Sequence, residues 1–226
     1  MPLRGQSAVV IWSDMADPAA HDLWHSREHL PERVAIPGFL RARRCVTLVA
    51  DAPRYFVLYE LKDAAILTSP AYLARLNQPT PWTAKTMESV RALSRTLCGV
   101  AASHGDGVGA HLMAVRLTPQ ASRTQELQTR LDDLLPKLAQ QPGLVGAHLL
   151  QREQAVARPD TIERQLRRHE DGFVDWVVVV EGYDAPALGT SVQQLLSADS
   201  LEQHGATQVS GFTGYHLQHL MCAEDL

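Results

Sequence analysis

The chain repeats one order of predicted elements, and this repetition constrains the fold more than any single motif. In the first half, four segments rich in β-branched and aromatic residues predict strands, and two further segments predict helices. The strands fall at 8–15, 39–48, 54–61 and within 91–102, and the helical segments at 17–35 and 64–89. Asp17 can cap the first helix, and Pro18 suits its first turn. The order is therefore strand, helix, strand, strand, helix, strand.

The second half follows the same order. Its strands fall at 110–117, 144–150, 176–182 and 212–220, and its helices at 122–140 and 185–197. Pro142-Gly143 precedes the second strand of this half, just as Pro37-Gly38 does in the first. The sequence therefore predicts two ferredoxin-like βαββαβ repeats, residues 1–104 and 110–226, joined by a glycine-rich linker at 105–109. The second repeat contains a polar insertion at 152–172, which we expect to form an exposed arm or lid.

Several predicted strands are apolar on both faces. The runs from Val9 to Trp12, from Tyr55 to Tyr59 and from Trp176 to Val180 show no alternation of apolar and polar residues. The helices of a βαββαβ unit cover one face of its antiparallel sheet, and an apolar face of this size is rarely left exposed. We therefore expect the two sheets to pack together as an α+β barrel within one chain. A second copy could bury the same faces, and exposed sheet edges would also favour a homodimer.

Charge and composition exclude several classes of protein. The 226-residue chain has a formal net charge of -4, so it lacks the basic surface that binds nucleic acid. Its cysteines, Cys45, Cys98 and Cys222, are too far apart to suggest a disulfide framework or a zinc site. No apolar run approaches the roughly 20 residues that span a membrane. The first strand pattern begins close to the N-terminus without an export segment. We therefore expect a cytoplasmic protein with no membrane or nucleic-acid partner.

The first predicted helix carries a cluster of titratable residues. At about 100° per residue, His25, Glu28, His29 and Glu32 fall on one face of this helix. Such a face could act as general acid and base near neutral pH. The spacing of His25 and His29 would also suit two ligands of one metal ion, with a carboxylate as the third.

The simplest interpretation of this face is that it points to solvent. Charged pairs three or four residues apart are common on helix surfaces. The opposite side of the helix then forms the core stripe: Ala20, Leu23, Leu30 and Val34. The solvated face, the acid/base site and the metal site stay open as alternatives at this point.

Three aromatic residues are further candidates for ligand contact. Tyr55 and Tyr59 share a strand face and could offer their hydroxyl groups to a ligand inside the barrel. Trp82, between Thr80 and Thr83, could line the mouth of a pocket. The alternatives are core packing for the two tyrosines and anchoring of a helix break for Trp82.

Two runs resemble a known superfamily. Trp24-His25-x3-His29-Leu30-Pro31, followed by Pro37-Gly38-Phe39, resembles the first helix and second strand of dimeric α+β barrel proteins. The EthD-like and antibiotic-biosynthesis-monooxygenase-like groups carry comparable patterns. The run from Leu76 to Thr83 (LNQPTPWT) resembles an uncharacterised bacterial branch in which two such units are fused. The resemblance covers the first repeat well and the second only in the order of its elements.

The resemblance implies a barrel that encloses a small organic molecule. The superfamily includes cofactor-free monooxygenases, isomerases and cyclases, together with haem-dependent enzymes. It implies that His29 is catalytic or contacts the ligand, with Trp24 beside it. Our leading hypothesis is an enzyme without cofactor or metal, of the isomerase, cyclase or monooxygenase type, that acts on a small organic acid or aromatic compound.

In this hypothesis His29 is the acid/base group, and His25 and Glu28 tune it. The candidate substrate contacts are Trp24, Glu32, Tyr55, Tyr59 and Trp82. The alternatives are a non-catalytic module that binds a small molecule, a haem- or metal-binding barrel, and an assembly subunit with a packed barrel.

Overall fold

The computed structural model describes residues 3–47, 49–154, 159–167, 170–210 and 212–226. The strands are β1 (Ser7–Met15), β2 (Phe39–Val46), β3 (Tyr55–Leu61), β4 (Val90–Gly105), β5 (His111–Pro119), β6 (Leu144–Arg152), β7 (Trp176–Gly182), β8 (Ala206–Ser210) and β9 (Gly214–Cys222). The α-helices are α1 (Pro18–Trp24), α2 (Leu30–Val34), α3 (Pro70–Asn77), α4 (Pro81–Met87), α5 (Thr124–Ala139), α6 (Ile162–Leu166), α7 (Ala185–Leu195) and α8 (Ala198–Gln203). A π-helical turn, η1 (His25–His29), joins α1 to α2, and 3-10 turns lie at η2 (Ala64–Thr68), η3 (Ala121–Arg123) and η4 (Ala223–Asp225).

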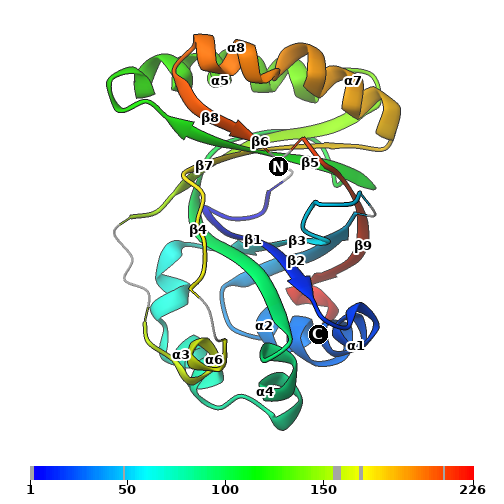
Figure 1. Ribbon diagram of the computed structural model, residues 1–226, viewed down its shortest axis with the longest axis vertical. Helices are drawn as coiled ribbons and strands as arrows, with labels where there is room; N and C mark the ends of the chain where they lie inside the picture. The colour runs from blue at the N-terminus through cyan, green and yellow to red at the C-terminus, as the bar shows by residue number, and fades with distance from the viewer. Residues whose placement is uncertain (1–2, 48, 155–158, 168–169, 211) are drawn as a thin grey trace.

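Eight of the strands form a closed antiparallel barrel (Figure 1). Their order is β7-β6-β4-β1-β3-β2-β9-β5, and pairing of β5 with β7 closes the ring. Two of these pairs, β4 with β6 and β2 with β9, join the first half of the chain to the second. The two sheets are thus hydrogen-bonded into one barrel. The predicted α+β barrel is confirmed, and the division of the chain at 105–109 stays a prediction.

Helices cover the outside of the barrel in two groups (Figure 1). The segment α1-η1-α2, together with α3 and α4, covers the half built from β1 to β4, whereas α5, α7 and α8 cover the other half. The turn that follows the first helical segment of each half contains a Pro-Gly pair. Gly38 and Gly143 both adopt a left-handed backbone conformation, with φ of 98° and 87°. Glycine reaches this conformation without steric cost, which explains the shared pair.

The structure also differs from the predicted elements. The helical region predicted at 64–89 is broken into η2, α3 and α4, because Ser69-Pro70 and Thr80-Pro81 each start a new helix with a side-chain cap. The sequence patterns did not indicate β8, a short and largely exposed strand that pairs with β5. Among the described residues, no helix is long and apolar enough to cross a membrane.

The polar insertion at 152–172 is not simply an exposed arm. It contains α6, which packs against α3 and α4 of the first half, and the side chains of Thr161 and Glu163 are buried. Residues 155–158 and 168–169 of the insertion lie outside the described residues. The insertion therefore brings charged residues of the second half onto the helices of the first.

Candidate functional site

The first helical segment contains one turn of π-helix. The backbone N–H of Leu30 donates to the carbonyl oxygen of His25, five residues back, instead of four. The extra residue shifts the phase of the helix, so His25 and His29 before this point and Val34 after it all face inward. Single π-turns of this kind often occur at functional sites.

The structure corrects the expected burial of this helix. Its histidine face does not point to solvent: His25 and His29 are only 3% and 9% exposed. Two residues of the expected core stripe are outside instead, with Leu23 57% exposed and Ala20 also exposed. Leu30 and Val34 are buried, as predicted. The polar side of α1 and η1 faces inward because it covers a cavity and not a packed core.

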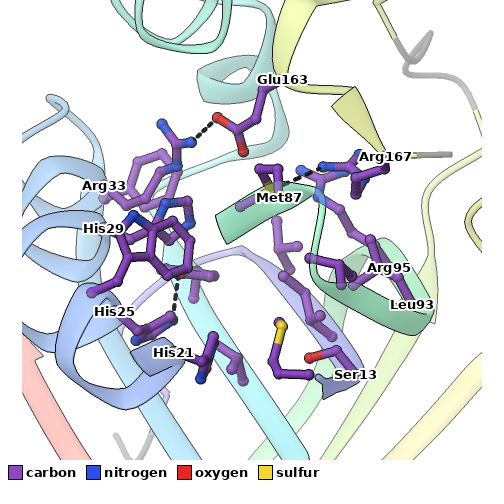
Figure 2. A pocket seen from close by; sticks show the side chains of 18 of the residues that line it. Ser13, His21, His25, His29, Arg33, Met87, Leu93, Arg95, Glu163 and Arg167 are labelled. Carbon is purple, nitrogen blue, oxygen red and sulfur yellow. Dashed lines mark hydrogen bonds and ion pairs between the residues drawn. The ribbon is translucent and has the colours of Figure 1, made fainter. Parts of the chain in front are cut away.

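This cavity lies between the outer face of the first-half strands and the helices that cover them (Figure 2). We call it the histidine chamber. Its volume is about 90 Å³, space for about three water molecules or one small organic group. The apolar side chains of its wall are Val9, Ile11, Met15, Phe39, Val57, Met87, Val90 and Leu93. The polar and aromatic ones are Ser13, His21, Trp24, His25, His29, Arg33, Tyr59, Tyr72, Arg95, Glu163 and Arg167.

A second, larger cavity adjoins the histidine chamber. This outer basin has a volume of about 510 Å³ and shares Tyr72, Arg95, Glu163 and Arg167 with the chamber wall. Residues of α3, β4 and the 152–172 insertion line it. The basin falls in the size range of small-molecule sites, about 300–1,000 Å³. A ligand could therefore place its reacting group in the chamber and the rest of its structure in the basin.

The three chamber histidines are held in the neutral form. Burial lowers the pKa of His21 to about 4, with a further contribution from the charge of Arg44. Burial also lowers the pKa of His25 and of His29 well below the ordinary value. The next contribution is the neighbouring His29 in the case of His25, and Arg33 in the case of His29. All three imidazoles are therefore uncharged at pH 7 and can accept a proton.

Two of these imidazoles have an unpartnered nitrogen. Nδ1 of His25 and Nδ1 of His29 are buried without a hydrogen-bond partner among the described residues. Nε2 of His25 lies 3.3 Å from the hydroxyl group of Tyr59. Buried polar atoms without a partner are uncommon because they cost free energy in the folded state. Both atoms belong to the wall of one cavity and are available to form a hydrogen bond with a molecule inside it.

Trp24 and Glu28 fix the position of His29. The Trp24 and His29 rings are in contact in a tilted arrangement, with centroids 4.4 Å apart and planes at 34°. The indole N–H of Trp24 donates to Oε1 of Glu28 and to Oγ1 of Thr83, each at 3.2 Å. The same carboxylate oxygen accepts hydrogen bonds from the hydroxyl groups of Thr80 at 2.6 Å and Thr83 at 2.9 Å. Glu28 thus links α4 to Trp24 and does not line the chamber.

The other candidate residues divide between the chamber wall and positions outside it. Tyr59 lines the chamber, but Tyr55 donates from its hydroxyl group to Asp22 at 2.8 Å, outside it. Glu32 pairs with Arg75 at 2.9 Å and is not part of the chamber wall. Trp82, 37% exposed, is also absent from it. The structure therefore brings together His25, His29, Trp24 and Tyr59 from the set chosen from the sequence.

Sequence reasoning missed four charged residues of the chamber: Arg33, Arg95, Glu163 and Arg167. Arg33 lies four residues after His29, so helical spacing could have indicated it. Glu163 and Arg167 belong to the polar insertion, whose charges are typical of a solvated segment. No local pattern shows that this segment folds back onto the first half.

The barrel interior, where the resemblance placed a ligand, is filled by side chains. Its apolar part includes Trp12, Phe56, Leu58 and Tyr215, all buried in one cluster. An eight-stranded barrel is just wide enough for side chains to fill it. The candidate site therefore lies outside the barrel, between strands and helices.

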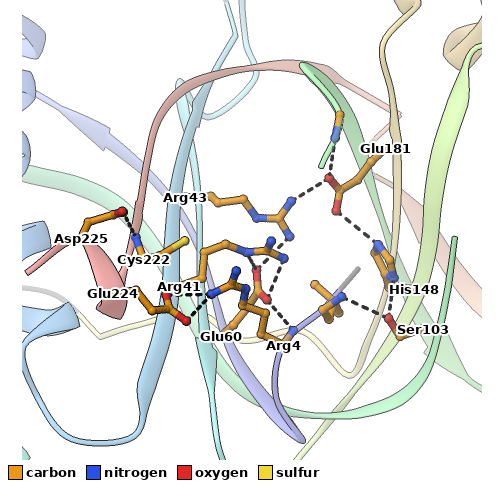
Figure 3. A network of polar contacts seen from close by, with 12 residues as sticks. Arg4, Arg41, Arg43, Glu60, Ser103, His148, Glu181, Cys222, Glu224 and Asp225 are labelled. Carbon is orange, nitrogen blue, oxygen red and sulfur yellow. Dashed lines mark hydrogen bonds and ion pairs between the residues drawn. The ribbon is translucent and has the colours of Figure 1, made fainter. Parts of the chain in front are cut away.

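A network of buried charges occupies the rest of the interior (Figure 3). Arg43, fully buried, contacts Glu181 of the second half at 2.7 Å and Glu60 of the first half at 3.2 Å. Glu181 also contacts Nε2 of His148 at 3.2 Å. Burial alone would raise the pKa of Glu181, but Arg43 and His148 outweigh it and lower that pKa. Arg43 thus joins the two halves through the carboxylates of Glu60 and Glu181.

The outer face of the second half contains no counterpart of the histidine chamber within the described residues. Five leucines of α5 fill the space between helix and sheet: Leu127, Leu131, Leu134, Leu135 and Leu138. They pack against valines such as Val178 and Val180 of β7. The two halves share an order of strands and helices, and the polar cavity lies in the first half.

Several solved structures share this fold. An anthrone oxidase-like protein superposes with a TM-score of 0.65 at 11% sequence identity, covering 96% of this chain and 92% of the other. A putative monooxygenase from Fusobacterium nucleatum subsp. nucleatum gives 0.58 at 8% identity, with 97% and 96% covered. A mutant chlorite dismutase from Candidatus Nitrospira defluvii gives 0.54 at 11% identity, with 94% and 90% covered.

These similarities establish the fold class. The chain has a ferredoxin-like α+β barrel fold, which these structures share. No protein-family model matches the sequence, and no curated protein matches it. At such low identity the likeness extends to the fold and not to the activity.

The buried ion pairs of the barrel predict a large loss of stability in Arg43→Ala. This substitution leaves Glu181 buried and without its guanidinium partner, so we expect a loss of roughly 3–5 kcal/mol in the free energy of unfolding. Urea denaturation followed by circular dichroism would measure it. Arg123→Ala, which removes an exposed pair with Glu126 on the surface, is the control and should unfold almost like the wild type. An unchanged midpoint for Arg43→Ala would contradict the assigned role.

The chamber histidines predict a loss of stability between pH 7 and pH 5. Their pKa values in the folded protein lie below the unfolded value of about 6.5, so the unfolded chain binds more protons in this range. The contribution of the neutral histidines to the free energy of unfolding is therefore fully present above pH 6.5 and is lost as the pH decreases toward 4. His21, with a pKa of about 4, should by itself lower the free energy of unfolding by about 2 kcal/mol between pH 7 and pH 5.

His21→Phe tests this assignment because it keeps an aromatic ring against Tyr55 and removes the titrating group. Its free energy of unfolding, measured at both pH values, should depend less on pH than that of the wild type. The same slope in both proteins would show that His21 is not buried in its neutral form.

Proposed function

We propose that the chain is an enzyme that transfers a proton on a small aromatic compound or organic acid bound in the histidine chamber. The observation that carries the proposal is the pair of buried, unpartnered Nδ1 atoms of His25 and His29 in the wall of one cavity. A packing role does not require such atoms. A substrate would supply their missing partner.

The proposed chemistry uses His29 as general base. Its neutral imidazole takes a proton from an acidic C–H or O–H group of the substrate, which leaves an imidazolium and a substrate anion. Arg33 and Arg167, whose charges lower the pKa of His29 before substrate binds, stabilise that anion. Return of the proton to the same or another atom gives exchange or isomerisation. The step is balanced without an oxidant or a cofactor.

The remaining chamber residues have supporting roles in this proposal. Trp24 packs against the ring of His29 and limits its rotation, and Glu28 fixes Trp24 through its indole N–H. The hydroxyl group of Tyr59 orients His25. The proposal gives no contact with substrate to Glu32, Tyr55 or Trp82, which lie outside the chamber wall.

The names of similar structures support an enzyme of this type. They include an anthrone oxidase-like protein and a putative monooxygenase, and an anthrone carries an acidic C–H group. We place the chain beside the EthD-like and antibiotic-biosynthesis-monooxygenase-like groups, as a fusion of two ferredoxin-like units. The order of strands and helices, followed twice, supports this placement.

A haem group does not fit the histidine chamber. The chamber itself, about 90 Å³, is too small for a porphyrin, and the described wall of the adjoining outer basin contains no histidine or cysteine to bind the iron. Within the described part of the chain, no group of three or more His, Cys, Asp or Glu side chains is arranged to hold a metal ion. The proposal therefore contains no step through haem or metal.

We predict that His29→Gln slows proton exchange about 100-fold or more, since general base catalysis contributes that much. The probes are phenylpyruvate and 1,8-dihydroxyanthrone, each with an acidic C–H group next to an aromatic ring. NMR in D2O would follow the incorporation of deuterium at that carbon. His111→Gln, a histidine of β5 away from the chamber, is the matched control and should keep the wild-type rate.

The outcomes separate the alternative functions. If the wild type binds the probes without accelerating exchange, the chamber belongs to a non-catalytic binding protein and the enzyme proposal is wrong. If His29→Gln exchanges protons of the probes at the wild-type rate, His29 is not the general base.

A further inference from the structure

The chamber contains an arginine whose partner comes from the other half of the chain. Arg33 of α2 is 4% exposed, and its Nη2 forms an ion pair with Oε2 of Glu163 on α6. The partners lie 130 residues apart in the sequence. Figure 2 shows the two side chains meeting at the edge of the chamber.

Glu163 accounts for only part of the hydrogen-bonding capacity of the Arg33 guanidinium group. It binds through one nitrogen, while Nη1 of Arg33 is buried without a hydrogen-bond partner among the described residues. A guanidinium can bind both oxygens of a carboxylate through two parallel N–H groups, and this geometry is the stronger one. The structure therefore shows Arg33 with a single-point contact where a two-point contact is available.

Charged side chains of both signs line the chamber. Its wall contains three guanidinium groups, Arg33, Arg95 and Arg167, and one carboxylate, Glu163. Asp171 of the outer basin pairs with Arg167 at 3.2 Å. The chamber histidines are neutral and contribute no charge. Among the guanidinium groups of the chamber, Arg33 therefore offers an Nη1 that is unpartnered within the described residues, beside its contact with Glu163, which a carboxylate ligand could reach.

We infer that Arg33 is the anion-binding group of this site and that the carboxylate of Glu163 stands in for the carboxylate of the substrate. This inference rests on the proposed function, that the chamber takes a small organic molecule. The substrate class is then an aromatic carboxylic acid. Its carboxylate replaces Glu163 on Arg33 and also reaches Nη1.

The position of Arg33 suits this role. It follows His29 by four residues across the π-turn and α2, and both side chains line the same chamber. A carboxylate on Arg33 would place an attached ring against the apolar wall formed by Val57, Met87 and Leu93. The acidic group of the substrate would then lie between Arg33 and His29.

Glu163→Gln tests whether Glu163 competes with the ligand. The substitution keeps the size of the side chain and removes the charge that now occupies Arg33. We expect the affinity for benzoate, measured by isothermal titration calorimetry, to rise about tenfold. The affinity for benzamide, which has the same shape without the charge, should not change. Glu224→Gln, which removes the partner of Arg4 on the surface, is the control and should bind benzoate like the wild type.

The double variant Arg33→Gln/Glu163→Gln tests the anion site without leaving an unpaired buried charge. It should bind benzoate and benzamide with equal affinity. Weaker benzoate binding by Glu163→Gln would overturn the inference and show that Glu163 only holds Arg33 in place. Continued preference of the double variant for benzoate would also overturn it.

These results can be told apart from a failure of the proposed enzyme activity. If benzoate responds to Glu163→Gln as expected but His29→Gln keeps its exchange rate, the anion site stands and the catalytic role does not. If proton exchange depends on His29 but benzoate binding does not depend on Arg33, the catalytic role of His29 stands and the anion site does not.

Discussion

The backbone groups along a sheet edge need hydrogen-bond partners, and this chain supplies them by pairing β4 with β6 and β2 with β9. These two pairs join the halves, and pairing of β5 with β7 closes the eight strands into a ring. A closed eight-stranded barrel has room for side chains and little else. Trp12, Phe56 and the charges around Arg43 occupy that room. A ligand is therefore left with the outer face of the strands, where the covering helices can stand away from the sheet.

The two halves use that outer face differently. In the second half, α5 presents leucines to the sheet and the space is filled. In the first half, the corresponding helical segment presents His21, His25 and His29, and a cavity remains. Buried nitrogen atoms without hydrogen-bond partners, such as Nδ1 of His25 and Nδ1 of His29 in the described part of the chain, reduce stability. Because the second half is packed with leucine, this loss of stability is confined to the histidine chamber of the first half.

The sequence predicted the barrel because its apolar strands cannot be exposed on either face, and because the Pro-Gly turn occurs at matching places in both halves. It also selected His25 and His29, since their spacing is visible along one helix. The π-turn at Leu30 was not predictable, because an i to i+5 bond leaves no recognisable pattern of residues. Glu163 was missed for a different reason. Its partner Arg33 is distant in the sequence, and only the folded chain shows that the charged insertion covers the first half.

Both halves of the barrel belong to one polypeptide, and this has a consequence for how such a protein can evolve. In an assembly of two identical chains, each mutation appears in both copies, so a substitution that opens a cavity in one copy also opens it in the other. A single gene that encodes both halves removes this restriction. Here the first half contains a polar cavity, and the second supplies packed leucines together with Glu163 from its insertion. A division of labour of this kind is open to a single chain with two different halves and closed to a symmetric pair.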